Sequence, residues 1–298
     1  MSIGQLPRPV GYVFGGGGSR GAVQVGMLQA LAEQQVAPDL VAGTSVGAIN
    51  GAVVALDPTS AANRLSHLWP RVTRSQVFPG GLLAQIRTLE QTRTHLFPNA
   101  ALESLITQFL GSGLSFDDTA VPFGLVTTDT ATGHAHPIRS GELLPALLAS
   151  AAIPGIFPVV EHDGLRLCDG GVVANVPMEL ALTMGARSLV VLDCDPAGCL
   201  PGPQTNLAEV FLVTIMMAMR AQAAYVAARV ATEVPVVYLP CSTTRLVSPL
   251  DFGHTEELIE TGYEMARSFL ATLEVTGPGL YGLQLPWLAL PQGPGSAR

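Results

Sequence analysis

The stretch that decides the fold is VGYVFGGGGSRGAVQVGMLQAL, residues 10–31. Its first five residues predict a short buried strand, and residues 22–34 follow with helical spacing. Between them lie four consecutive glycines, which cost backbone entropy that no ordinary core position would recover. Exposed peptide N–H groups at the start of a helix are typical of an anion site, so the loop is predicted to hold a negative charge.

A second unit of the same kind follows at once. Residues 40–42 predict a strand and residues 45–56 a helix. Two consecutive strand–turn–helix units predict an α/β fold with a parallel sheet. Because the units are sequential, we expect their two turns to lie side by side at one edge of the sheet.

The remaining chain shows no linker or internal repeat and predicts one domain, residues 8–275, with a Gly- and Pro-rich tail, residues 276–298, that packs irregularly from Gly277. Residues 59–110 have a helical pattern broken at Pro70, 79–81 and Pro98. Further strands are expected at 121–128, 134–139, 165–168, 188–193 and 235–239, and long helices at 207–230 and 255–273.

Composition excludes several classes of protein. Hydrophobic residues make up 48% of the 298 residues, yet residues 143–160 contain three prolines and residues 210–219 are too short to span a bilayer. The first ten residues lack the charged start and apolar stretch of a secretory signal. We therefore expect a soluble, cytoplasmic protein. The net charge of −8 argues against nucleic acid as a partner.

The residue types present also limit the chemistry. There is no lysine, which excludes Schiff-base catalysis and a lysine on a nucleotide phosphate. None of the four cysteines belongs to a CxxC pair, so neither a metal site nor a disulfide is implied, and buried free thiols are expected. These cysteines are Cys168, Cys194, Cys199 and Cys241.

The glycine loop has one alternative reading as a dinucleotide site. Gly16, Gly18 and Gly21 have the GxGxxG spacing between a strand and a helix. Such a site also needs an acid at the carboxyl end of the second strand, and Asp39 precedes that strand instead. The dinucleotide reading, which also leaves Arg20 unexplained, is therefore the less favoured one.

The second turn carries GTSVG, Gly43 to Gly47, a G-x-S-x-G pattern between a strand and a helix. Such an elbow holds the serine in a strained conformation with its hydroxyl exposed, and the flanking glycines avoid clashes. The alternative is that Ser45 simply caps the helix. A nucleophilic Ser45 needs donors for an oxyanion, and Gly17 and Gly18 in the neighbouring loop are the best candidates.

The serine also needs a base, and two candidates remain. Asp169, in CDGGVVANVP, follows an apolar strand, although an aspartate there could be a plain turn former. His254, the only histidine after Asp169, would complete an α/β-hydrolase triad. That fold places several strands before its elbow, and only one precedes Ser45, so Asp169 is preferred.

Together these motifs resemble those of the patatin-like phospholipases. GGGSRG at 16–21 resembles their glycine-rich oxyanion loop, GTSVG their nucleophile elbow, and DGG at 169–171 their base motif. The segment 149–160 and the residues Asn175 and Pro177 also fit the family. The three motifs occur in the family's order, and the resemblance covers about residues 10–195.

The resemblance implies a three-layer α/β/α fold with a mainly parallel sheet and a catalytic dyad of Ser45, the nucleophile, and Asp169, the general base. It implies an oxyanion loop of Gly16, Gly17 and Gly18, with Arg20 bracing the loop or meeting a substrate phosphate. Motif-supporting glycines are Gly21, Gly43, Gly47, Gly170 and Gly171. The implied reaction is hydrolysis of a lipid or lysophospholipid ester through an acyl-serine, without metal or cofactor. Acyl transfer, and lipid binding without turnover, remain alternatives.

Two further segments concern the substrate. Residues 59–95 contain five arginines and a single acid, Glu90, interspersed with apolar residues. This composition predicts a lid or a peripheral membrane contact, with a solvated helical face as the alternative. Met216, Met217 and Met219 on the predicted helix 207–230 would line an acyl pocket or, the favoured interpretation, pack in the core.

Overall fold

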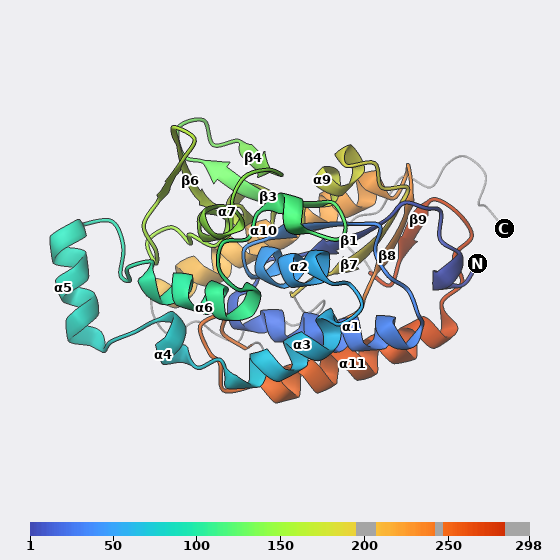
Figure 1. The fold of residues 1–298 in the computed structure, drawn as a ribbon, viewed down its shortest axis with the longest axis horizontal. Coiled ribbons are helices and arrows are strands. Elements are labelled where there is room, and N and C mark those ends of the chain that lie inside the picture. The colour runs from blue at the N-terminus through green and yellow to red at the C-terminus, as the bar shows by residue number, and fades with distance from the viewer. Residues whose placement is uncertain (195–206, 242–246, 284–298) are drawn as a thin grey trace.

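The centre of the molecule is a pair of parallel strands that are buried along their whole length. A computed structural model describes residues 1–194, 207–241 and 247–283 (Figure 1). In it β1 (Val10–Phe14) pairs with β2 (Leu40–Thr44), as the two strand–turn–helix units predict. Each strand leads into a helix, α1 (Ala22–Glu33) or α2 (Val46–Leu56). The two turns therefore lie at the same edge of the sheet.

The other strands extend this pair into a mixed, mostly parallel sheet. Its order is β5-β6-β3-β2-β1-β7-β8-β9, and β4 pairs with β3 outside this path. The pairs of β3 with β4, β3 with β6 and β5 with β6 are antiparallel, and the others are parallel. The bounds are β3 (Phe123–Asp129), β4 (Ala135–Ile138), β5 (Val160–His162), β6 (Leu165–Asp169), β7 (Ser188–Leu192), β8 (Pro235–Tyr238) and β9 (Gly279–Tyr281).

Helices cover both faces of the sheet, which confirms the three-layer prediction. Alternate residues of a strand point to opposite faces, so Tyr12 and Phe14 pack in one core and Val13 in the other. The first core lies under α1, α2 and α11 (Thr255–Thr272), and α1 and α11 run side by side (Figure 1). The second lies under α9 (Met178–Thr183) and the carboxyl half of α10 (Leu207–Val230).

A helical insertion between α2 and β3 carries the segment 59–95. It contains α3 (Ala61–Leu68), a 3-10 turn (Trp69–Arg71), α4 (Arg74–Val77), α5 (Leu82–Thr92) and α6 (Ala100–Leu110). The breaks fall at the prolines and glycines that predict them. In Figure 1, α5 stands away from the rest of the molecule, whereas α3 and α6 lie against it.

The structure corrects one prediction about the tail. Residues 279–281 form β9, the edge strand beside β8, whereas irregular packing was expected from Gly277. Residues 284–298 lie outside the described part of the chain, and the division of the chain at residue 276 stays a prediction. Four elements are not predicted by the sequence pattern: α7 (Leu143–Ser150), α8 (Gly171–Ala174), α9 and β5.

The methionines and cysteines have different outcomes. The favoured core packing of the α10 methionines is wrong, because Met217 is 50% exposed and Met216 and Met219 are only partly buried. Cys168, Cys194 and Cys241 are buried and form no disulfide, as expected, and Cys199 lies outside the described residues. Within the ranges that the structure describes, no helix is long and apolar enough to cross a bilayer.

Candidate active site

Ser45 occupies the sharp turn between β2 and α2. Its backbone has φ 55° and ψ −128°, the strained conformation that the elbow predicts. Its N–H donates to Ser150 Oγ at 3.0 Å, and that hydroxyl donates to the carbonyl of Val126 at 2.7 Å. Although Ser45 precedes the first residue of α2, its side chain makes no capping hydrogen bond. The hydroxyl is therefore not used to cap the helix.

The glycines of the elbow allow α2 to approach the sheet closely. A Cβ at Gly47 would lie 2.4 Å from the carbonyl oxygens of Phe14 and Gly15. A Cβ at Gly43 would lie 2.6 Å from Ala48 Cα. Both distances are far below van der Waals contact, so the position of Ser45 depends on glycine at these two positions.

Asp169 ends β6 and lies buried beside Ser45. Burial raises the pKa of its carboxyl group from the usual 3.8 to about 6, while hydrogen bonding from the Ser45 side chain and from the Gly171 N–H acts in the opposite direction. The Gly171 N–H donates to Asp169 Oδ1 at 2.7 Å. Asp169 is thus a carboxyl group near Ser45 that is ionised at neutral pH but is a stronger base than an exposed one.

The glycine loop faces this pair, but its N–H groups are not equivalent. The Gly16 N–H donates to the carbonyl of Asn175 at 3.0 Å, so it is not available to an oxyanion, and the prediction of Gly16 as a donor is corrected. The described residues include no hydrogen-bond acceptor for the N–H of Gly17 or Gly18. A Cβ at Gly16 would lie 3.1 Å from Ser45 Cβ, so Gly16 permits the close approach of the loop.

Arg20 lies buried beneath the same loop. Its Nε donates to the carbonyl of Gly17 at 3.4 Å. This contact favours the interpretation of Arg20 as a brace of the loop over a contact with a substrate phosphate.

A buried polar chain that the sequence analysis missed also holds the loop. Gln24 Nε2 donates to the carbonyls of Gly15 at 2.8 Å and Leu192 at 2.9 Å. Asn50 Nδ2 donates to Gln24 Oε1 at 2.8 Å, and Trp69 Nε1 donates to Asn50 Oδ1 at 2.9 Å. The signal in the sequence is an amide residue among the apolar residues of each helix, Gln24 near the start of α1 and Asn50 in α2.

The remaining motif glycines sit at points of close contact. A Cβ at Gly21 would lie 2.7 Å from Val46 Cγ2, and a Cβ at Gly170 would lie 2.2 Å from the carbonyl oxygen of Val126. A Cβ at Gly171 would lie 2.8 Å from Met219 Cε. These glycines therefore bring the oxyanion loop, β3 and α10 close to the two candidate catalytic residues.

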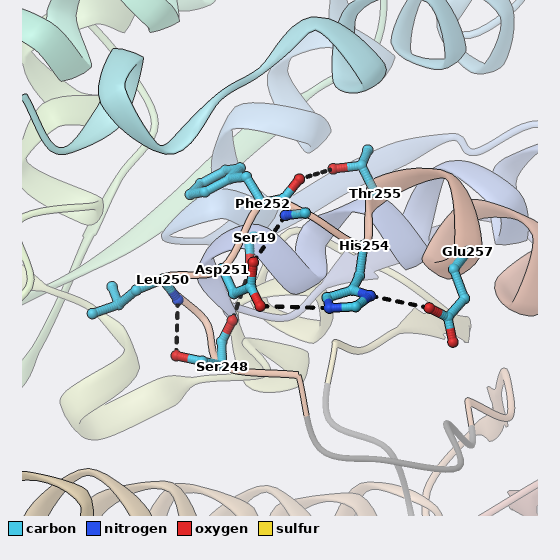
Figure 2. A network of polar contacts seen from close by, with 9 residues as sticks. Ser19, Ser248, Leu250, Asp251, Phe252, His254, Thr255 and Glu257 are labelled. Carbon is cyan, nitrogen blue, oxygen red and sulfur yellow. Dashed lines mark hydrogen bonds and ion pairs between the residues drawn. The ribbon is translucent and has the colours of Figure 1, made fainter.

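A loop from the carboxyl-terminal third of the chain closes over the glycine loop (Figure 2). The Ser19 N–H donates to the carbonyl of Pro249 at 2.8 Å, and Ser19 Oγ donates to the carbonyl of Ser248 at 3.0 Å. Figure 2 shows His254 between Asp251 and Glu257. Its Nε2 lies 3.6 Å from Asp251 Oδ2, and its Nδ1 lies 3.1 Å from Glu257 Oε2. These contacts tie His254 to the base of this loop and to the first turn of α11.

A cleft opens at Ser45, and almost all of the surface that lines it is apolar. Its walls include Trp69, Phe78, Leu105, Phe109, Phe157 and Phe252. Most of these residues come from the helical insertion. The cleft can hold an acyl chain with its carbonyl carbon at the serine. The residues lining it do not include the α10 methionines, so the acyl-pocket interpretation of these methionines is not supported either.

The acid considered for a dinucleotide site has a structural role at the other end of the strand. Asp39 precedes β2, accepts a hydrogen bond from the Val10 N–H at 2.6 Å and pairs with Arg8. It therefore does not lie at the carboxyl end of β2, where a ribose would bind.

Comparisons with known proteins show the family of the chain. Residues 12–182 match the model of the family described as patatin-like phospholipase. Patatin-like phospholipase domain-containing protein 7 of Mus musculus is 31% identical over 189 residues, which are 62% of this chain and 13% of that protein. Lysophospholipase NTE1 of Mycosarcoma maydis is 28% identical over 193 residues, 62% of this chain and 10% of that protein. The chain thus spans a small part of these curated relatives.

Solved structures of similar shape were also found. VipD from Legionella pneumophila aligns over 89% of this chain and 67% of its own, with 16% identity and a TM-score of 0.47. Human GIVD cytosolic phospholipase A2, in complex with methyl gamma-linolenyl fluorophosphonate, aligns over 88% of this chain and 58% of its own, with 12% identity and a TM-score of 0.46. At these TM-scores the likenesses add nothing to the fold, which follows from the sheet order itself.

Proposed function

Because the chain belongs to the patatin-like phospholipase family, we propose that it is a lipid acyl hydrolase with a catalytic dyad of Ser45 and Asp169. The observation that carries the proposal is the pairing of the two side chains. Ser45 has a strained backbone, its side chain does not cap α2, and it lies close enough to the buried Asp169 carboxyl to lower the pKa of that group, which burial raises to about 6. A base with this pKa is ionised at neutral pH and can accept the serine proton.

The first half-reaction forms an acyl-serine. Ser45 Oγ attacks the acyl carbonyl carbon as its proton passes to Asp169, and the carbonyl electron pair moves to the oxygen. The N–H groups of Gly17 and Gly18 donate to that oxyanion, aided by the positive end of the helix that follows. When the tetrahedral intermediate collapses, the ester bond breaks and the leaving alcohol takes the proton from Asp169.

The second half-reaction uses water in place of the alcohol. Water gives a proton to Asp169 as its oxygen attacks the acyl-serine carbonyl carbon. Collapse of this intermediate releases the carboxylic acid and returns the proton to Ser45 Oγ. The apolar cleft holds the acyl chain through both steps, which favours lipid esters over short polar esters.

The apolar cleft and the family support a lipid as the substrate. We propose a phospholipid or lysophospholipid, which the protein meets at the surface of a membrane through the segment 59–95. The catalytic domain is proposed to cover residues 8–275. Neither step requires a metal ion or a cofactor.

Covalent labelling tests the proposal directly. The parent protein should react with a fluorophosphonate probe and hydrolyse a soluble ester, and Ser45→Ala should abolish the labelling and lower kcat by about 10⁴-fold or more. Ser104→Ala, which removes an exposed hydroxyl on α6, should behave like the parent. Full labelling of Ser45→Ala would reject Ser45 as the nucleophile. A parent that neither labels nor turns over any lipid ester would instead indicate a lipid-binding protein.

A further inference from the structure

Helix α5 presents an apolar face that nothing in the described structure covers. None of the described side chains of α5 is buried, and Leu83, Ile86 and Leu89 are 83%, 44% and 44% exposed. Figure 1 shows the helix standing away from the sheet and from the other helices. An isolated helix of 11 residues is marginal in water, because packing supplies most helical stability. This face is therefore a contact surface.

The three exposed residues form one continuous stripe along the helix. Leu83, Ile86 and Leu89 follow each other at intervals of three residues, which places successive side chains on adjacent turns of the same side. Arg87 and Thr88 lie on the polar side, Arg93 follows the last turn, and the exposed Glu90, four residues after Ile86, lies on the same side as the stripe. An apolar stripe flanked by cationic residues is the pattern of a helix that lies in a lipid interface.

The charge around α5 is opposite to that of the whole chain. Residues 59–95 contain five arginines and one acid, a net charge of +4. Because the whole chain has a net charge of −8, the residues outside this segment have a net charge of −12. Arg64 Nη2 donates to the carbonyl of Phe109, and Arg74 lies over the Phe78 ring, so both are tied to the body. Arg71, Arg87 and Arg93 are exposed.

The insertion that carries α5 also forms a wall of the cleft at Ser45. Trp69, Val77 and Phe78 line the cleft and precede α5 in the chain by fewer than fifteen residues. α5 is therefore joined by a short stretch of chain to the segment that lines the cleft at the serine. Such an arrangement fits a substrate that is extracted from a bilayer.

We propose that α5 docks the protein on an anionic lipid bilayer. Leu83, Ile86 and Leu89 insert between the headgroups, and Arg71, Arg87 and Arg93 contact lipid phosphates. The proposal deepens the proposed function and rests on it, because it names the surface on which the lipid substrate is presented. An anionic bilayer matches both the apolar stripe and the local positive charge, whereas the acidic remainder of the chain would be repelled by it.

Vesicle binding by a protein without turnover tests the proposal. All variants carry Ser45→Ala and are sedimented with vesicles of equal parts phosphatidylcholine and phosphatidylglycerol. Replacing Arg71, Arg87 and Arg93 together by Gln should weaken binding about 100-fold, and added salt should weaken binding of the unreplaced protein. The matched control replaces Arg139, Arg166 and Arg187, which are exposed outside the insertion, and should bind like the unreplaced protein.

The apolar stripe has its own test. Leu83→Ser and Leu89→Ser together should weaken binding about 100-fold to vesicles of either composition, anionic or pure phosphatidylcholine. Ile215→Ser with Tyr225→Ser, which removes exposed apolar residues of α10, should leave binding unchanged. Both sets of variants should keep the far-ultraviolet circular dichroism and melting temperature of the parent, since α5 does not pack on the core.

Other results would overturn the proposal. Equal binding by the α5 variants and their controls would exclude α5 as the docking surface. Loss of a parent dimer in the α5 variants, without a change in vesicle binding, would assign the stripe to an interface between copies of the chain. Fluorophosphonate labelling of Ser45 does not depend on docking when it is measured without vesicles in proteins that keep the serine. Failure of the docking proposal is therefore distinguishable from failure of the proposed reaction.

Discussion

The buried base is predicted to lower the stability of the protein at neutral pH. The pKa of Asp169 rises from 3.8 to about 6 because burial penalises the ionised carboxylate. At about 1.4 kcal/mol for each pH unit, this rise of about two units corresponds to about 3 kcal/mol. Replacing the carboxylate by a neutral group of the same shape should remove this cost. We therefore predict that Asp169→Asn is inactive but more stable than the parent by up to about 3 kcal/mol at pH 7.

The sign of the pH dependence follows from which state binds the proton. Between pH 3.8 and about 6 the folded state keeps the proton of Asp169 and the unfolded state has lost it. The contribution of this group to the stability of the parent is therefore largest below pH about 4 and falls as the pH rises through about 6. The gain in Asp169→Asn should accordingly be present at pH 7 and disappear near pH 4.

Urea unfolding at a series of pH values from about 4 to 8 measures the difference. The replacement amide oxygen can still accept the hydrogen bond from the Gly171 N–H, so the packing of the site is kept. Asp129→Asn is the matched control: the pKa of the half-buried Asp129 is lowered, first by the N–H of Ala131 and then by the hydroxyl of Thr132. That substitution should give no stabilisation at pH 7. An Asp169→Asn protein that is no more stable than the parent, or a gain that does not vary with pH, would refute the reasoning.

The remaining predictions concern the rate and the buried polar chain. Because Asp169 must be ionised to act as a base, kcat/KM on a soluble ester should fall tenfold for each pH unit below about 6 and level off above it; a rate independent of pH down to about 4 would contradict this role. Asn50→Leu leaves Gln24 Oε1 and Trp69 Nε1 buried without these partners, so it should lower the free energy of unfolding by about 2–6 kcal/mol and reduce kcat more than it raises KM. Asn63→Leu, at an exposed position, serves as its control. Equal stability of the two variants would show that the buried polar chain does not hold the glycine loop.

The local pattern around the two glycine-rich turns predicted the centre of the fold well. β1 has the predicted bounds, and the helical breaks in the insertion fall at Pro70, 79–81 and Pro98. Strong turn formers and continuous apolar runs act locally, so they can be read without tertiary contacts. The strained conformation of Ser45 follows in the same way from the elbow motif.

The failures share a dependence on long-range contacts. β9 has only three residues, Gly279–Tyr281, and it forms because β8 offers an open edge. The Gly16 N–H is taken by Asn175, which lies 159 residues away in the chain. The methionines of α10 are apolar, but the hydropathy of this helix does not show which of its two halves packs against the sheet. None of these contacts leaves a periodic signal in the sequence.

The loop that ends at His254 bears on how homologous proteins can diverge in the substrate that they accept. Pro249 and Phe252 line the cleft, and the Pro249 carbonyl holds the Ser19 N–H, yet both residues lie outside the stretch 12–182 that matches the family. Part of the cleft wall is thus encoded outside the stretch that carries the three motifs. If the cleft holds the acyl chain as proposed, substitutions at Phe252 should change the accepted acyl length while all three motifs stay intact, and homologues with the same motifs need not share a substrate.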